Sequence, residues 1–163
     1  MRKWVLAGIL SAAALGVFAA DKEDIVCEKD FSSLEGFVNV KNAGPARLEG
    51  RPVLKIDSEG GVQLWITVPA GESVRFSAEM KGDNVVRLEN QHYFGAKCEL
   101  FYKIDEKAFF SGLGCRVGTF DWIPVSKTLD TPTGKDLPVM VSFGLHRASG
   151  AMYVRNFKVE IVR

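Results

Sequence analysis

The residues best suited to chemistry surround one tryptophan. Trp65 belongs to an alternating segment, residues 62–68, in which the aliphatic side chains predict a buried face and Trp65 and Gln63 occupy the opposite face. A flat aromatic ring among hydrogen-bonding groups suits a pyranose sugar, because the sugar C–H bonds stack on the ring while its hydroxyls pair with polar neighbours. The structural alternative is that a loop or the N-terminal segment covers Trp65.

A second alternating segment extends this candidate site. Residues 74–80 follow a Pro-Ala-Gly turn, and the two segments predict a hairpin with one buried face. In that hairpin Trp65 lies opposite Ser77, with Arg75 and Glu79 nearby. These three polar residues are therefore candidate ligand-binding residues together with Gln63 and Trp65.

Further candidates lie on a strand and a loop. Phe101 falls on an outward position of a predicted strand, where it either extends the aromatic platform or packs beneath a loop. Residues 89–94 join two strands, and loops on rigid β-sandwiches often carry binding groups. His92 and Tyr93 are candidate sugar contacts there. The alternative is an ordinary solvated loop with Phe94 turned inward.

Catalytic and metal-binding patterns find little support in the sequence. Neither of the two histidines belongs to a nucleophile or metal motif, and Asp105-Glu106 is a turn pair rather than an opposed acid and base. We expect no enzyme activity, no cofactor and no metal. A small hydrolase stays open as a third hypothesis, because two carboxylates can converge from distant parts of a chain.

Three cysteines, Cys27, Cys98 and Cys115, leave one unpaired in an oxidising compartment. With Asp105 to Ala108 as the tip of a hairpin, positions 98 and 115 fall opposite each other. A Cys98–Cys115 disulfide is therefore predicted, with Cys27 as a buried thiol. The alternative is that no disulfide forms.

The N-terminus predicts export. Arg2 and Lys3 precede an uncharged, mostly apolar run from Trp4 to Phe18, and a small residue follows at Ala19. We interpret residues 1–19 as a signal peptide and residues 20–163 as one domain, secreted or periplasmic and without a membrane span after cleavage. The run is short for a spanning helix, which needs about 20 apolar residues, and an uncleaved anchor is the alternative.

Charge excludes one class of partner. The whole chain has a formal net charge of +1, and removal of Arg2 and Lys3 with the signal peptide leaves 19 basic and 20 acidic residues, a net charge of −1. No basic excess remains to neutralise a phosphate backbone, so nucleic acid is not expected as a partner.

The fold class follows from the alternation pattern. After the signal peptide no long segment shows helical periodicity. The sequence has instead about ten short alternating runs, separated by Gly, Pro, Asn and Asp. This pattern predicts an all-β, two-sheet antiparallel β-sandwich or jelly roll.

In the order of its motifs, the chain resembles the exported carbohydrate-binding modules of the galactose-binding-like jelly-roll superfamily. The likeness spans residues 60–162, and each motif is weak by itself. It rests on four stretches, which are a turn, strand and Lys-Gly step at 69–82, a strand with an acidic turn at 99–107, a Gly-Thr…Trp motif at 118–122, and a final strand at 152–157. The resemblance implies a jelly roll and suggests sugar binding.

The chain departs from these modules at their calcium site. Many of them hold a structural calcium with an acidic residue on the final strand and another near the first strand. Here Arg155 occupies the position of the acidic residue on the final strand. Near the first strand, Phe31 is followed by Ser32 instead of an acidic residue. Because a guanidinium repels a cation, the departure predicts no calcium there and an ion pair from Arg155 to an N-terminal acid such as Asp30.

The leading functional prediction is an exported, non-catalytic carbohydrate-binding module. It would bind a polysaccharide or other glycan by stacking on an exposed aromatic residue of one sheet face. The alternative is a structural or protein-interaction β-sandwich of the cell envelope, with a separate envelope protein or enzyme as partner. An open Trp65 in a groove favours the first, and a Trp65 beneath a loop favours the second.

Overall fold

The computed structural model describes residues 24–163, which form nine β-strands. The signal peptide predicted for residues 1–19 lies outside the described residues. The strands are β1 (Ile25–Lys29), β2 (Phe37–Leu48), β3 (Arg51–Val68), β4 (Ser73–Arg87), β5 (Gly95–Ile104), β6 (Lys107–Arg116), β7 (Gly118–Asp130), β8 (Leu137–His146) and β9 (Ala148–Ile161).

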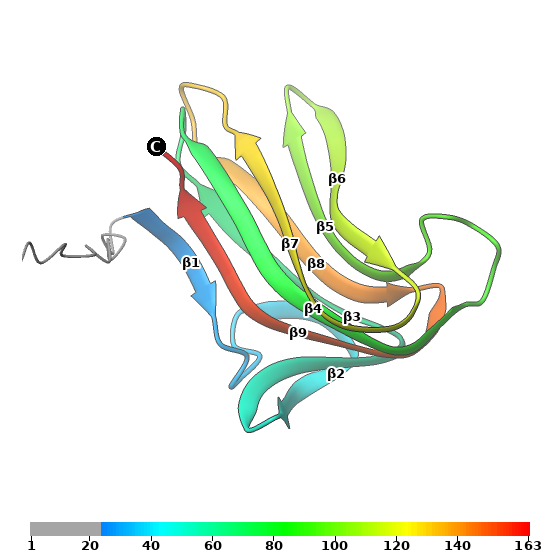
Figure 1. Cartoon of the computed structure of the whole chain (residues 1–163). Helices are drawn as coiled ribbons and strands as arrows, with labels where there is room; N and C mark the ends of the chain where they lie inside the picture. Colours follow the sequence, from blue (N-terminus) through cyan, green and yellow to red (C-terminus); the bar gives the residue numbers. More distant parts are fainter. Residues whose placement is uncertain (1–23) are drawn as a thin grey trace, which may run out of the picture.

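The strands build two layers that face each other, as Figure 1 shows. One layer has the order β6-β5-β8-β3, with β2 paired to β3; the other has the order β7-β4-β9, with β1 paired to β9. We call these the β5–β8 sheet and the β4–β9 sheet. All the pairings are antiparallel. The predicted two-sheet antiparallel sandwich is confirmed.

The core lies between the layers because apolar side chains alternate along each strand. Val62, Leu64 and Ile66 of β3 are buried, as are Val139, Val141 and Phe143 of β8. Phe76 and Phe157 meet them from the β4–β9 sheet, and the rings of Phe143 and Phe157 pack edge to face with centroids 5.2 Å apart. Burial of this face fixes which side chains are left to form an outer surface.

The long strand β3 connects the two layers. Residues 54–57 pair with β9, and residues 61–68 pair with β8, so the strand changes partner at Gly60. A Cβ on Gly60 would lie 2.5 Å from the carbonyl oxygen of Asp57, so only glycine fits this bend. Residues 51–68 therefore form one long strand instead of two short ones, and the described chain has nine strands where the sequence predicts about ten.

The predicted hairpin between residues 62–68 and 74–80 is wrong. Trp65 pairs with Met140 of β8, whereas Ser77 pairs with Ser126 of β7 and Lys158 of β9. The chain crosses from one sheet to the other between β3 and β4. A Pro-Ala-Gly turn is compatible with either connection, so the local sequence did not distinguish them.

The predicted Cys98–Cys115 disulfide is also wrong, and all three cysteines are free thiols. The β5–β6 turn has only two residues, because Ile104 pairs with Lys107, and a bulge further along adds Leu113 to β6. Cys98 therefore faces Gly114, and Cys115 faces Lys97. Adjacent positions of a strand point to opposite faces, so Cys98 is buried while Cys115 is exposed on the outer face.

Among residues 24–163 there is no helix long and apolar enough to cross a membrane.

Candidate functional site

A row of aromatic and apolar side chains crosses the outer face of the β5–β8 sheet. Trp65 of β3 pairs with Met140 of β8, Met140 pairs with Phe101 of β5, and Phe101 pairs with Phe110 of β6. Antiparallel partners present their side chains on the same face, so these four groups form one continuous strip. We call Trp65, Met140, Phe101 and Phe110 the aromatic row.

The aromatic row is open to solvent. Trp65 is 52% exposed and Phe110 is 69% exposed, while Phe101 and Met140 are half-buried. The Phe101 and Phe110 rings lie with centroids 4.9 Å apart and planes tilted by 46°. A hollow of about 350 Å³ lies beside Trp65 and Phe101, with Pro138 and Lys103 among its other lining residues. No loop of the described chain therefore buries Trp65.

A polar row adjoins the aromatic row on the same face. Gln63 pairs with Ser142, which pairs with Glu99. Asn39 of β2 donates from Nδ2 to Gln63 Oε1 at 2.5 Å, and Lys97 Nζ lies 2.7 Å from Glu99 Oε1. The Gln63 side chain is thus held by a neighbouring strand and remains half-buried at the surface.

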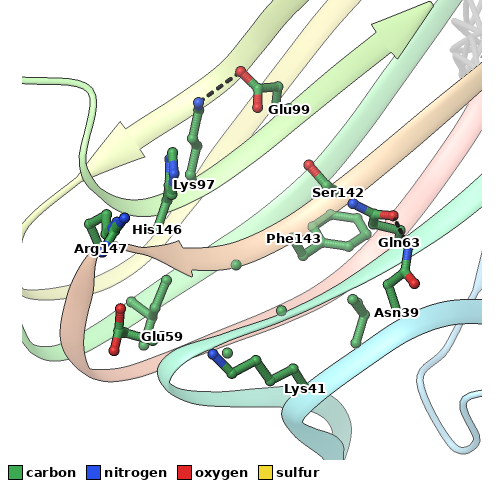
Figure 2. Close-up of a pocket in the computed structure, with 15 residues that line it drawn as sticks. Asn39, Lys41, Glu59, Gln63, Lys97, Glu99, Ser142, Phe143, His146 and Arg147 are labelled. Carbon is green, nitrogen blue, oxygen red and sulfur yellow. Dashed lines mark hydrogen bonds and ion pairs between the residues drawn. The ribbon is translucent and has the colours of Figure 1, made fainter.

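The polar row opens into a groove of about 390 Å³ (Figure 2). It runs over β2, β3, β8 and β5, and its polar lining residues are Asn39, Lys41, Glu59, Gln63, Lys97, Glu99, Ser142, His146 and Arg147. Amide, hydroxyl, ammonium and carboxylate groups supply both donors and acceptors here. A polyhydroxylated ligand could be held in this groove with its apolar side on the aromatic row.

The structure brings three of the predicted ligand residues together and leaves the others elsewhere. Trp65, Gln63 and Phe101 share the outer face of the β5–β8 sheet. Sequence reasoning missed several neighbours on that face, among them Met140, Phe110, Ser142, Glu99 and Asn39. The alternation within each strand did signal outward positions, but the pairing of β3 with β8 and β5 was needed to align them.

The predicted residues Arg75, Ser77 and Glu79 belong to β4 and therefore to the opposite sheet. Arg75 forms an ion pair with Glu160, and the Ser77 hydroxyl donates to the Lys158 carbonyl oxygen at 3.4 Å. Their predicted proximity to Trp65 is wrong, since it depended on the β3–β4 hairpin.

Glu79 instead forms an ion pair with Arg155. The Arg155 Nε donates to Glu79 Oε2 at 2.5 Å, and the guanidinium lies 4.0 Å from the centroid of the Trp122 ring. The predicted pairing of Arg155 with Asp30 is wrong, because Asp30 Oδ1 accepts from Ser32. The ion-pair partner of Arg155 is therefore Glu79 of the adjacent strand β4, and not an acidic residue near the N-terminus.

His92 and Tyr93 lie beyond the end of the groove. Their rings continue an edge-to-face chain through Phe94, which is buried, to His146. The Phe94 and His146 centroids are 5.0 Å apart, and His146 lines the groove. The loop therefore supports the groove through His146, while His92 and Tyr93 are not among the residues that line it.

Among residues 24–163, no group of three or more His, Cys, Asp or Glu side chains could hold a metal ion. Cys115 is the thiol on the outer face near Lys97, and burial of its sulfur raises its pKa, an effect that the nearby Lys97 charge opposes. The protonated thiol is a weak nucleophile at neutral pH.

Several solved structures with similar folds are carbohydrate-binding modules. "Family 16 Carbohydrate Binding Module-2" aligns with 83% of this chain and 97% of its own, with 16% identity and a TM-score of 0.59. The CBM22-1 xylan-binding domain of Xyn10C from Paenibacillus barcinonensis aligns with 86% of this chain and 96% of its own, with 16% identity and a TM-score of 0.56. The C-terminal family 22 module of Clostridium thermocellum Xyn10B gives 14% identity, 86% and 95% coverage, and a TM-score of 0.55.

These similarities define the fold. The chain shares its β-sandwich fold with these three modules, which confirms the expected architecture. No protein-family model matches the sequence, and no curated protein matches it. At identities this low, a shared fold does not carry function, and the function has to be argued from the site.

Proposed function

We propose that this protein is a glycan-binding module whose binding face is the outer surface of the β5–β8 sheet. The observation that carries the proposal is the alignment of Trp65, Phe101 and Phe110 in one solvent-open row beside the polar row. A sugar ring has apolar C–H faces and a polar rim, and these two rows offer matching surfaces side by side.

The site favours a chain of sugars over a single sugar. Trp65 and Phe101 are separated by β8, and two strand spacings correspond to about 10 Å. This distance is close to the length of a disaccharide, so both rings can stack only on different units of one ligand. The open groove continues past the polar row and leaves room for further units.

The decisive experiment compares two exposed apolar residues by affinity electrophoresis and isothermal titration calorimetry on a panel of soluble xylans, glucans and galactans. Trp65→Ala should abolish binding or reduce it about fivefold or more, because it removes a stacking surface worth about 1–3 kcal/mol. Leu88→Ala is the matched control, since Leu88 is 53% exposed but lies away from both rows. Binding that survives Trp65→Ala would refute this site.

We propose binding without catalysis. Glu59 and Glu99 both line the groove, and the Glu99 carboxylate is engaged by Lys97 Nζ at 2.7 Å. Glycoside hydrolysis by two carboxyl groups needs both of them free to act on the glycosidic bond, and the Lys97 contact occupies one of them here. If each bound polysaccharide is recovered at unchanged length, this part of the proposal is supported. If the protein releases reducing ends from a polysaccharide and the Glu99→Gln variant does not, this part is contradicted.

Export is the remaining part of the proposal. The charged and apolar pattern of residues 1–19 supports a cleaved signal peptide, and a glycan ligand is consistent with a secreted or periplasmic location. The alternative of an envelope protein without a sugar ligand would stand if no polysaccharide in the panel bound.

A further inference from the structure

A third row of residues crosses the same face beyond the polar row. Lys41 of β2 pairs with Gly61 of β3, Gly61 pairs with Gly144 of β8, and Gly144 pairs with Lys97 of β5. In this row the neighbouring strands β3 and β8 therefore carry no side chain, and a lysine lies on each side of them. Figure 2 shows Lys41 and Lys97 on opposite sides of the groove.

Close backbone packing favours glycine in this floor. A Cβ on Gly61 would lie 3.0 Å from the carbonyl oxygen of Phe143, and a Cβ on Gly144 would lie 3.0 Å from that of Gly60. The floor is bare backbone, so a ligand group can lie between the two lysines. Three strand spacings separate these lysines, about 14 Å between backbones, and their long side chains can narrow this gap.

The two ammonium groups differ in their partners. Lys97 is engaged with Glu99 at 2.7 Å, with side chains only 18% and 23% exposed, but an ammonium has three donors and can serve a second acceptor. Lys41 is exposed and has no carboxylate within 4 Å among residues 24–163. It therefore offers an uncompensated positive charge to the groove.

The other charged groups at the groove offset one another. Glu59 and Arg147 line its outer end, and Arg147 Nη1 also lies 3.6 Å from Glu89 Oε1. Lys97 is engaged with Glu99, so among residues 24–163 Lys41 is the groove lysine without an acidic partner within 4 Å. An ammonium can donate hydrogen bonds to the hydroxyls of a neutral sugar, but it binds a carboxylate more strongly because that hydrogen bond joins opposite charges.

We propose that the groove selects glycans with uronic acid units and that Lys41 binds the uronate carboxylate over the glycine floor. This inference rests on the proposed glycan binding and specifies its ligand class. The sugar backbone stacks on the aromatic row, and the carboxylate of a unit further along accepts charge-assisted hydrogen bonds from Lys41 and Lys97.

The test uses two polymer pairs, glucuronoxylan and polygalacturonate, each alongside a preparation with its carboxyl groups reduced to alcohols. Calorimetry should show tighter binding to an acidic polymer than to its reduced form. Lys41→Gln should weaken binding to the acidic polymer about three- to tenfold and leave binding to the reduced polymer unchanged. High ionic strength should remove the same increment. Lys135→Gln is the control, because Lys135 is exposed in the β7–β8 loop.

Two outcomes would overturn the inference and are distinguishable from failure of the proposed function. If Lys41→Gln weakens binding to both forms equally, Lys41 only hydrogen-bonds hydroxyl groups. If neutral glycans of the panel bind through Trp65 while neither acidic polymer binds better than its reduced form, glycan binding stands and uronate selection is wrong.

Discussion

At the scale of single residues, exposure separates the groups available to a ligand from those that hold the fold. Phe109 and Phe110 are neighbours on β6, yet they belong to different faces. Phe110 continues the aromatic row from Phe101, while Phe109 stacks on Tyr102 with centroids 5.3 Å apart and planes within 10°. The pair therefore offers an internal comparison of two phenylalanines in the same strand.

Phe110→Ala should lower glycan affinity about three- to tenfold, because the ring is 69% exposed and ends the aromatic row. Its effect on the melting temperature should be small, since little apolar surface is buried there. Phe109→Ala is the control and should leave glycan affinity unchanged. Calorimetry and thermal unfolding on both variants check the prediction, and equal losses of affinity would count against the row.

At the scale of elements, strand pairing decided what the candidate site contains. Trp65 and Gln63 were identifiable from the alternation of β3 alone. Arg75, Ser77 and Glu79 were assigned to the same site because a turn between two alternating segments predicts a hairpin. Sandwich folds also use such turns to cross between sheets, and the choice depends on where each apolar face finds a partner.

Gly60→Ala tests the element that links the sheets. A Cβ there would lie 2.5 Å from the Asp57 carbonyl oxygen and 2.7 Å from those of Asn42 and Lys41, all of them backbone atoms. We expect a loss of about 1–3 kcal/mol in the free energy of unfolding, together with weaker glycan binding, since Lys41 flanks the groove.

Gly44→Ala is the matched control for this substitution. Gly44 lies in β2, and an added Cβ would have no atom within 4 Å. Urea denaturation of both variants provides the measurement. A Gly60→Ala protein as stable as Gly44→Ala would show that the bend tolerates a side chain.

At the scale of the whole molecule, the sandwich holds together without covalent crosslinks. The core is supplied by both sheets, and a domain of this size can bury enough apolar surface to fold without disulfides. Cys98 packs inside this core, with its Sγ 3.9 Å from Met80 Sδ, and burial raises the pKa of its thiol far above the ordinary value. It should react only when the protein unfolds.

One intact-mass measurement checks the export and the free thiols together. The protein recovered from the secreted or periplasmic fraction should begin at Ala20. Alkylation in denaturant without a reducing agent should add three groups, one for each cysteine. Alkylation without denaturant should leave Cys98 unmodified. A chain that retains residues 1–19 would contradict cleavage, and a single added group would indicate a disulfide.

The sequence by itself determined the fold class and the outward position of Trp65, because alternation is a local pattern, and its apolar run predicts a signal peptide over residues 1–19. It did not determine strand partners, since these depend on contacts between distant segments. The two-residue turn and the Leu113 bulge shifted β6 and turned Cys115 away from Cys98. The aromatic row, the polar row and the glycine floor between Lys41 and Lys97 exist only because β2, β3, β8, β5 and β6 lie in one register. Only the tertiary structure could decide that register, because it is fixed by burying one face of every strand at the same time.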